Sequence, residues 1–216
     1  MMVILRWLGH ECFEIKDDGT VVTDPHDGAG IGLPRPQAEA DIVTVSHGHF
    51  DHANGIGIVS KPGAVVIETP GERSIKGITI KGIASFHDNA QGTMRGKNVI
   101  FNIRIDGISF CHLGDLGHAL SEEQLTEIGK VDVLLIPVGG HYTIDAGEAA
   151  EIMDMINPRI VIPMHYKTRG LTVDIADAEV FLRGRENVRR YAESQVEIER
   201  SGLPARTEIW VLSPPK

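Results

Sequence analysis

Cysteine is nearly absent from this sequence. Cys12 and Cys111 are the only two in 216 residues, and they stand far apart with no C-x-x-C pairing. Proteins that depend on disulfides carry several cysteines in a regular framework, so a disulfide scaffold is excluded. We therefore expect the protein to occupy a reducing compartment.

Positive charge and long apolar runs are also scarce. The chain has 21 Lys and Arg against 30 Asp and Glu, a net charge of −9. A nucleic-acid-binding surface needs clustered Lys and Arg, so no nucleic-acid partner is expected. No apolar run approaches a membrane span, and the first residues do not form a charged segment followed by a long apolar one. We expect a cytoplasmic protein without membrane contact.

The length sets the expected number of domains. A chain of 216 residues can bury most of its unfolded surface in one core. The sequence shows no linker, low-complexity tract or short repeat that would divide it. We expect a single domain over residues 1–216.

One short segment concentrates ligand side chains. Residues 47–52 read His-Gly-His-Phe-Asp-His, which places three imidazoles and one carboxylate within six positions. Imidazole nitrogen and carboxylate oxygen are donors that zinc and similar divalent metals prefer. His47 and His49 can reach one point, whereas Asp51 and His52 lie further round the same turn and can reach a second. A solvated polar loop is the competing interpretation, but four such ligands crowded together without a cation would be costly to bury. The segment predicts a metal site suited to two ions.

Apolar runs and turn signals predict strands in series, then strands alternating with helices. Asp17-Asp18-Gly19 indicates a hairpin, because glycine takes the positive φ that such a turn needs. A helix is expected to begin near Asp51, and another is expected over 175–182. A third is expected from Ser121, which forms a capping box with Gln124, to about residue 128, and a fourth from Asp145 to about residue 156. Strands are expected at 3–8, 12–16, 20–23, 41–45, 65–68, 75–84, 99–105, 109–111, 131–137, 159–163 and 208–212. This order favours a two-layer sheet core flanked by helices, with similar halves.

Three further ligand residues each follow a predicted strand. They are His87, Asp115 and His165. Loops at strand ends are where side chains from several strands can converge on one site. Each residue alone is more often a capped or solvated polar group, but together, after the 47–52 segment, they indicate one shared centre.

The ordered set of motifs resembles the metallo-β-lactamase superfamily. The matches are Asp24 after an early strand, the 47–52 segment, His87, Asp115 and His165, spread over residues 3–166. Segments 8–13 (Leu-Gly-His-Glu-Cys-Phe), 114–117 (Gly-Asp-Leu-Gly) and 139–143 (Gly-Gly-His-Tyr-Thr) are also similar to the small branch that includes L-ascorbate-6-phosphate lactonase.

The resemblance implies a fold and a set of ligands. The fold would be an αββα four-layer sandwich of the α+β class, with two divalent metal ions at the sheet edge. The first ion would take His47, His49 and His87, and the second would take Asp51, His52 and His165. Asp115 would bridge the two ions. Asp24 would hold ligand imidazoles in the correct tautomer from outside the coordination shell.

Two ions sharing a water imply metal-assisted hydrolysis. Each ion lowers the pKa of bound water from near 16 to about 7 in a favourable zinc site, which gives metal-bound hydroxide at neutral pH. The second ion would polarise the substrate oxygen, and Asp51 would orient the hydroxide, with Asp115 as the other catalytic carboxylate. The substrate would be a small ester, lactone, amide, thioester or phosphodiester. Zinc is the favoured metal, with manganese and iron as alternatives.

Five further residues are candidates for the substrate pocket. His118, His141 and Tyr142 lie in loops after strands, and His10 and His26 lie near the predicted site. For His10 and His26, packing is as well supported as a pocket role, and Tyr142 could equally pack against the sheet. His112 is expected to be structural. Lys167 and Arg169 could meet an anionic group, although solvated surface charge is the commoner fate of such residues.

Two other functions compete with a small-molecule hydrolase. One is a phosphodiesterase or nuclease of the same fold. The other is a metal-binding or sensing protein without turnover, which would be expected to have lost some of Asp24, Asp51 and Asp115, all of which are present here. The partner expected is a small-molecule substrate, and the sequence leaves the oligomeric state open.

Overall fold

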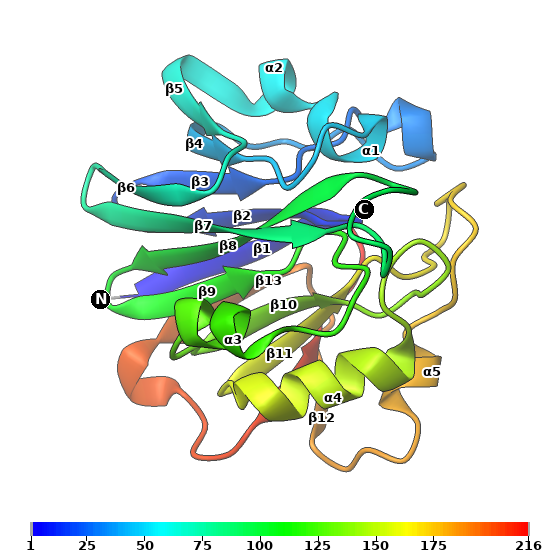
Figure 1. Cartoon of the computed structure of the whole chain (residues 1–216). Helices are drawn as coiled ribbons and strands as arrows, with labels where there is room; N and C mark the ends of the chain where they lie inside the picture. The colour runs from blue at the N-terminus through cyan, green and yellow to red at the C-terminus, as the bar shows by residue number, and fades with distance from the viewer. Residues whose placement is uncertain (1, 216) are drawn as a thin grey trace.

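The computed structural model describes residues 2–215 and consists of two β-sheets that face each other (Figure 1). The first sheet has six strands in the order β13-β1-β2-β3-β4-β5, and the second has eight in the order β12-β14-β11-β10-β9-β8-β7-β6. The strands of the first sheet are β1 (Met2–Gly9), β2 (Cys12–Lys16), β3 (Thr20–Thr23), β4 (Ala40–Thr44), β5 (Ser60–Ile67) and β13 (Gln195–Glu199). The strands of the second are β6 (Gly71–Ile75), β7 (Ile78–Phe86), β8 (Lys97–Ile105), β9 (Ile108–His112), β10 (Val133–Pro137), β11 (Ile160–Met164), β12 (Val188–Arg190) and β14 (Glu208–Val211).

Short helices cover the outer faces of the sheets. In Figure 1, α1 and α2 lie beside β4 and β5, and α3 and α4 lie on the opposite side of the molecule. The predicted capping residues Ser121 and Asp145 are confirmed, because each side chain accepts from the helix backbone and each helix has a full capping box. The helices are α1 (Phe50–Ala53), α2 (Ile56–Val59), α3 (Glu122–Ile128), α4 (Ala146–Ile156) and α5 (Glu179–Leu182), with 3₁₀ turns η1 (Ala29–Ile31) and η2 (Arg200–Gly202). The predicted αββα arrangement of the α+β class is confirmed.

The core lies between the two sheets. Trp7 and Phe13 of the first sheet and Phe101 and Phe110 of the second are all almost fully buried in one apolar cluster. All five residues of β10, and likewise of β11, are buried, as expected for central parallel strands covered on both faces. This cluster holds the two sheets together and fixes the relative position of their edges.

Parallel pairing brings several strand ends to one edge. In the first sheet β3 and β4 are parallel, and in the second β9, β10 and β11 are parallel. β7 runs in the same direction as β9, because each is antiparallel to β8. The loops after all six strands therefore gather at the edge on the right of Figure 1.

Some predicted elements differ from the structure. The strand expected over 75–84 is two strands, β6 and β7, because Lys76 and Gly77 take positive φ and turn the chain into a hairpin. The helix expected over 175–182 is only the single turn α5, and β5 begins five residues before the expected 65. β12 and β13 were not predicted, since they are short edge strands with few buried positions.

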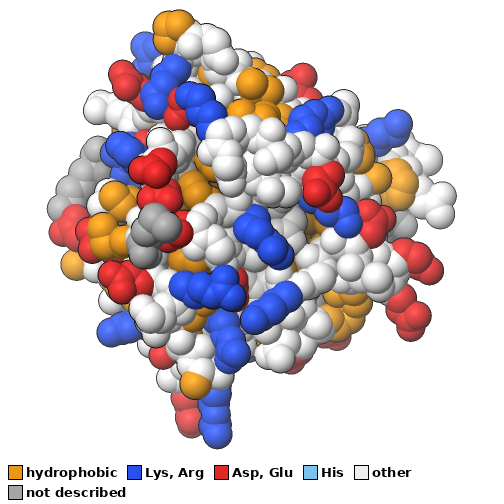
Figure 2. All heavy atoms as spheres, turned by 90° about the vertical axis from the view of Figure 1, so that its left-hand side faces the viewer, with side chains coloured by type: hydrophobic (Ala, Val, Ile, Leu, Met, Phe, Trp, Pro, Cys, Tyr) orange, Lys and Arg blue, Asp and Glu red, His pale blue; other side chains and the backbone are white. Residues whose placement is uncertain are grey.

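The surface away from the converging loops mixes both charges. Figure 2 shows the face at the left of Figure 1, where Lys and Arg side chains are surrounded by Asp and Glu and apolar side chains form only small patches. Among the described residues, no helix has the length and apolar character needed to cross a membrane.

Candidate metal centre

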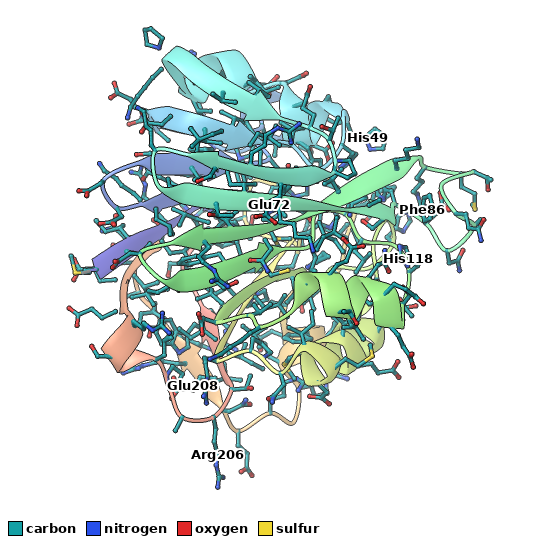
Figure 3. The ribbon with its side chains drawn as sticks, turned by 60° about the vertical axis from the view of Figure 1, so that its left-hand side comes forward. His49, Glu72, Phe86, His118, Arg206 and Glu208 are labelled. Carbon is teal, nitrogen blue, oxygen red and sulfur yellow. The ribbon has the colours of Figure 1, made fainter. Side chains whose placement is uncertain are left out.

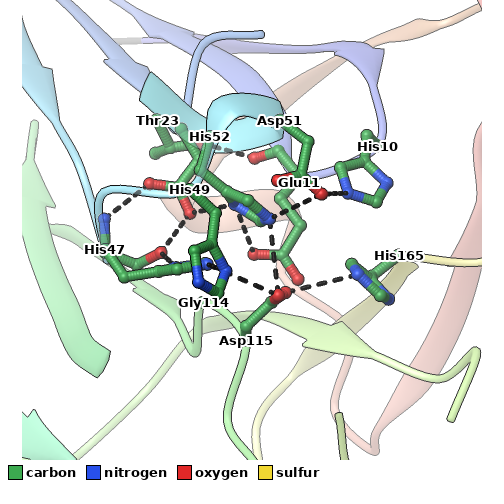
Figure 4. A network of polar contacts seen from close by, with 12 residues as sticks. His10, Glu11, Thr23, His47, His49, Asp51, His52, Gly114, Asp115 and His165 are labelled. Atoms are coloured by element: carbon green, nitrogen blue, oxygen red, sulfur yellow. Dashed lines mark hydrogen bonds and ion pairs between the residues drawn. The ribbon is translucent and has the colours of Figure 1, made fainter. Parts of the chain in front are cut away.

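The seven predicted ligands lie together at the edge where the strands end. His47 and His49 follow β4, Asp51 and His52 belong to α1, and the other three follow β7, β9 and β11. Figure 4 shows the side chains from both sheets pointing toward one another. Residues from distant parts of the chain thus meet in one cluster.

Asp115 occupies the centre of this cluster. Its Oδ2 lies 3.0 Å from Nε2 of His87, 3.4 Å from Nε2 of His52 and 3.6 Å from Nε2 of His47. Its Oδ1 lies 3.4 Å from Nε2 of His165. One buried carboxylate therefore faces four imidazoles, three of them near Oδ2 and one near Oδ1.

Gly114 brings Asp115 into this position. It has a φ of 57°, and a Cβ there would collide with Oδ1 of Asn98 and with the Ser46 side chain. His112 supports the same turn, because its Nδ1 accepts from the backbone N–H of Gly114 at 3.2 Å. His112 has the structural role expected from the sequence.

The imidazoles fall into two groups. His47, His49 and His87 each offer a ligand nitrogen, and the three atoms lie within 4.8 Å of one another. On the other side, nitrogens of His52 and His165 form a similar group with His10. The Asp51 carboxylate lies beside this second group, with Oδ2 3.6 Å from Nε2 of His52.

Asp24 contacts one imidazole of the second group directly and one of the first group through Ser46. Its Oδ2 accepts from Nδ1 of His52 at 3.1 Å, and from Oγ of Ser46 at 2.5 Å. Since the Ser46 hydroxyl donates to Asp24, its oxygen is left to accept from Nδ1 of His47 at 3.0 Å. Both imidazoles then carry their proton on Nδ1, which leaves the Nε2 lone pairs directed toward Asp115.

The electrostatics of the site favour cation binding. Burial lowers the pKa of both His47 and His165 to about 3, so both are neutral near pH 7 and have lone pairs available for a metal. Burial disfavours the charged form of His52, but the Asp115 carboxylate outweighs it and holds the pKa of His52 well above its usual value. Without a metal, Nε2 of His52 therefore also carries a proton, which a bound cation would displace. Burial also acts against ionised Asp115, but the imidazoles of His165 and His52 hold its pKa well below the usual range. The carboxylate is ionised and attracts positive charge.

The cluster contains ligand atoms that no described residue satisfies with a hydrogen bond. Nε2 of His52 and Oδ1 of Asp115 are buried without a hydrogen-bond partner. Buried polar atoms are normally paired, so unsatisfied ones clustered in this way mark the place of a missing partner. Divalent cations fit, because the neutral imidazoles and carboxylates are ligands that zinc, manganese and iron accept.

Comparison with known proteins identifies the family. The family model described as "Beta-lactamase superfamily domain" matches residues 4–165. The chain belongs to the metallo-β-lactamase superfamily. It is similar to a UPF0173 metal-dependent hydrolase of Thermococcus onnurineus, with 31% identity over 77% of this chain and 86% of that protein. A similar protein of Thermoplasma volcanium, also described as a UPF0173 metal-dependent hydrolase, is 32% identical over 78% of this chain and 85% of that protein.

A solved structure extends the likeness over the whole fold. A protein from Thermotoga maritima, described as a candidate Zn-dependent hydrolase of the metallo-β-lactamase superfamily, has 38% identity and a TM-score of 0.82, with both chains covered completely. The protein is thus a metal-dependent hydrolase of this superfamily. The finer resemblance to L-ascorbate-6-phosphate lactonase stays a prediction.

The candidate metal centre is bordered by a cavity of about 560 Å³. Tyr142 lies in its wall, whereas the sequence left a pocket role and packing against the sheet equally open. The cavity also contains an arginine, Arg95, whose guanidinium lies 5.2 Å from the centre of the Tyr142 ring. Sequence analysis missed Arg95, because it lies in the 87–96 loop without a recognisable motif around it.

The other four predicted pocket residues do not line this cavity. His26 is fully buried, where its Nε2 contacts the carbonyl oxygen of Leu8 at 3.2 Å. His118 accepts from the backbone N–H of Phe86 at 3.1 Å, and Figure 3 shows the two residues side by side. His141 is exposed and borders a neighbouring hollow. Their polar atoms are directed to the backbone or solvent, which the sequence pattern does not reveal.

His10 is the fourth, and it lies inside the cluster. Its side chain is fully buried, with Nε2 3.3 Å from Oδ2 of Asp51 and its ring 4.4 Å from that of His165. His10 and the next residue, Glu11, enter from the turn between β1 and β2. Glu11 was not predicted, although it is completely buried at the centre of the site. Burial and the Asp115 carboxylate raise the pKa of Glu11 well above its usual value.

Proposed function

We propose that the protein hydrolyses a small ester or lactone with two divalent metal ions, zinc being the favoured choice. The first ion would be held by His47, His49 and His87, and the second by Asp51, His52 and His165, with Asp115 shared between them. The position of Asp115 carries the proposal, because its two oxygens face both groups of imidazoles at 3.0 to 3.6 Å. When bound, such ions supply an activated water and a Lewis acid for the substrate oxygen.

Asp51 is the carboxylate suited to orient the attacking water. It lines the cavity, and its Oδ2 contacts Nε2 of His10 at 3.3 Å. Burial raises the pKa of Asp51, but the hydrogen bond with His10 and the nearby His52 imidazole outweigh that effect, and the net shift is downward. An ionised Asp51 can accept a hydrogen bond from the water and align it toward the substrate. Tyr142, in the cavity wall, can donate its phenol hydrogen to a substrate oxygen.

The cavity suits a small molecule with an anionic group. A volume of about 560 Å³ lies within the range of small-molecule sites, and Phe50 and Val173 provide apolar wall. Arg95 provides a cation in the wall of the same space. The Asp88 carboxylate fixes the loop that carries it, since it accepts from four backbone N–H groups, those of residues 90, 92, 94 and 95. Arg95 is thereby positioned to bind a carboxylate or phosphate of the substrate.

Metal-reconstituted protein is to be assayed against lactones, esters, thioesters and phosphodiesters, each in a neutral and an anionic form. Turnover of anionic lactones or esters above the other classes is expected. A phosphodiesterase is the second candidate, because Arg95 would serve a phosphodiester equally well. Faster turnover of bis-p-nitrophenyl phosphate than of every lactone and ester would favour that function.

The substitution Arg95→Met tests the anion site. A charged hydrogen bond is worth about 1.5–3 kcal/mol, so KM for the anionic substrate should rise roughly 10- to 100-fold. Turnover of the neutral analogue should change little. Arg206→Met is the control, because Arg206 is exposed at a distance from His49 in Figure 3. An equal loss for neutral and anionic substrates would exclude anion recognition by Arg95.

A further inference from the structure

Glu11 is the most poorly satisfied buried carboxylate among the described residues. Its side chain is fully buried, and neither carboxylate oxygen has a hydrogen-bond partner. Figure 4 shows this carboxylate in the middle of the cluster, between Asp51, Asp115 and His165. A buried carboxylate without a partner strongly disfavours folding unless a cation or proton compensates it. Its presence therefore indicates that another group binds there.

The backbone of Glu11 is held from both sheets. Its carbonyl oxygen accepts from Oγ1 of Thr23 in the first sheet at 2.9 Å. The same oxygen lies 2.9 Å from Nε2 of His112 in the second sheet, and that nitrogen is the donor because Nδ1 of His112 already accepts from Gly114. The side chain is thus anchored by two hydrogen bonds at its base, so its direction into the cluster is fixed by the fold.

The neighbours of the carboxylate are metal-ligand atoms. One Glu11 oxygen, a carboxylate oxygen of Asp115 and a ring nitrogen of His165 all lie within 4.8 Å of one another. Oε2 also lies 3.7 Å from Nδ1 of His52, too far for a hydrogen bond, and that nitrogen already donates to Asp24. Two carboxylates brought together in a dry interior repel each other unless positive charge lies between them. The surroundings fit a cation better than a hydrogen bond.

We propose that Glu11 is a further ligand of the second metal ion, on the side of the centre formed by His52, His165 and Asp115. This assignment rests on the two-ion site proposed above and adds a carboxylate to its ligands. The second ion would then be held by more oxygen ligands than the first, whose group consists of His47, His49 and His87.

The test uses Glu11→Gln, which keeps the shape of the side chain and removes its charge. Zn²⁺ binding is measured by titration against a competing chelator, and thermal unfolding is measured in excess EDTA. One of the two Zn²⁺-binding steps should weaken by more than about 100-fold, since losing a direct ligand costs more than the roughly 10- to 100-fold lost with an orienting hydrogen bond. The metal-free variant should unfold at the same temperature as the unmodified protein or higher, because the amide is neutral and needs neither a proton nor a cation to compensate it.

A purely structural role for Glu11 gives the opposite pattern. The metal-free variant would then unfold at a lower temperature or fail to fold, and Zn²⁺ affinity would be unchanged; either result overturns the proposal. Glu14→Gln is the matched control, because Glu14 is on the next strand and pairs with Arg6 at 2.8 Å. It should leave Zn²⁺ affinity unchanged. If the unmodified protein binds only one Zn²⁺, the proposed two-ion site is wrong. If the unmodified protein and Glu11→Gln both bind two Zn²⁺ with the same affinities, the two-ion site stands and only the role of Glu11 is rejected.

Discussion

The substitution Asp115→Asn is expected to remove at least one bound metal ion and to lower kcat by at least about 100-fold. Asp115 faces both groups of imidazoles, so its negative charge would lie between two cations and reduce their repulsion. An amide keeps the size of the side chain but carries no charge and only one oxygen. Metal content after dialysis and turnover of the best substrate are the two measurements.

Asp132→Asn serves as the control for this substitution. Asp132 is also a buried aspartate, and it accepts from the backbone N–H of Ser109 at 3.0 Å, at the start of β9 and so far from the metal centre. It should lose some stability but no metal. Full metal content together with retained activity in Asp115→Asn would remove Asp115 from the bridging position.

The second large expected effect is a difference between Asp24→Ala and His165→Ala in how far excess metal restores activity. Asp24 orients His52 directly and His47 through Ser46, so its loss should weaken metal affinity by roughly 10- to 100-fold. Excess metal should then restore part of the activity by mass action. His165→Ala removes a proposed direct donor, and excess metal should restore little, because one ion stays under-coordinated.

Asp24 also accepts from the backbone N–H of Ser46 at 2.7 Å, so the fold of Asp24→Ala requires its own check. Asp24→Asn retains an acceptor oxygen for that contact and should behave like Asp24→Ala in a metal titration. Identical titration curves for the Asp24 and His165 variants would show that Asp24 is itself a ligand or is needed for folding.

The seven proposed ligands could be picked out from the sequence because their signals are local. Four of the seven lie within residues 47–52, and their spacing alone indicates a metal site. The other three each follow a strand, and parallel strands deliver their ends to one edge of a sheet. Convergence therefore follows from the order of the elements, without knowledge of the packing.

Residues whose role depends on contacts across the two sheets could not be assigned. Glu11 stands in a turn between two strands, and only the meeting of the sheets encloses it beside His165. Arg95 reaches the cavity because Asp88 closes its loop, a contact without a sequence signature. His26 and His118 looked available from the sequence, but their ring nitrogens contact backbone groups.

Metal analysis of fully loaded protein tests the two-ion centre most directly. Purified protein is stripped with a chelator, loaded with Zn²⁺ to saturation, freed of excess metal and measured for metal per chain. Six donor residues in two groups, with Asp115 between them, predict about two ions per chain. A firm value of one under saturating metal would contradict the two-ion centre.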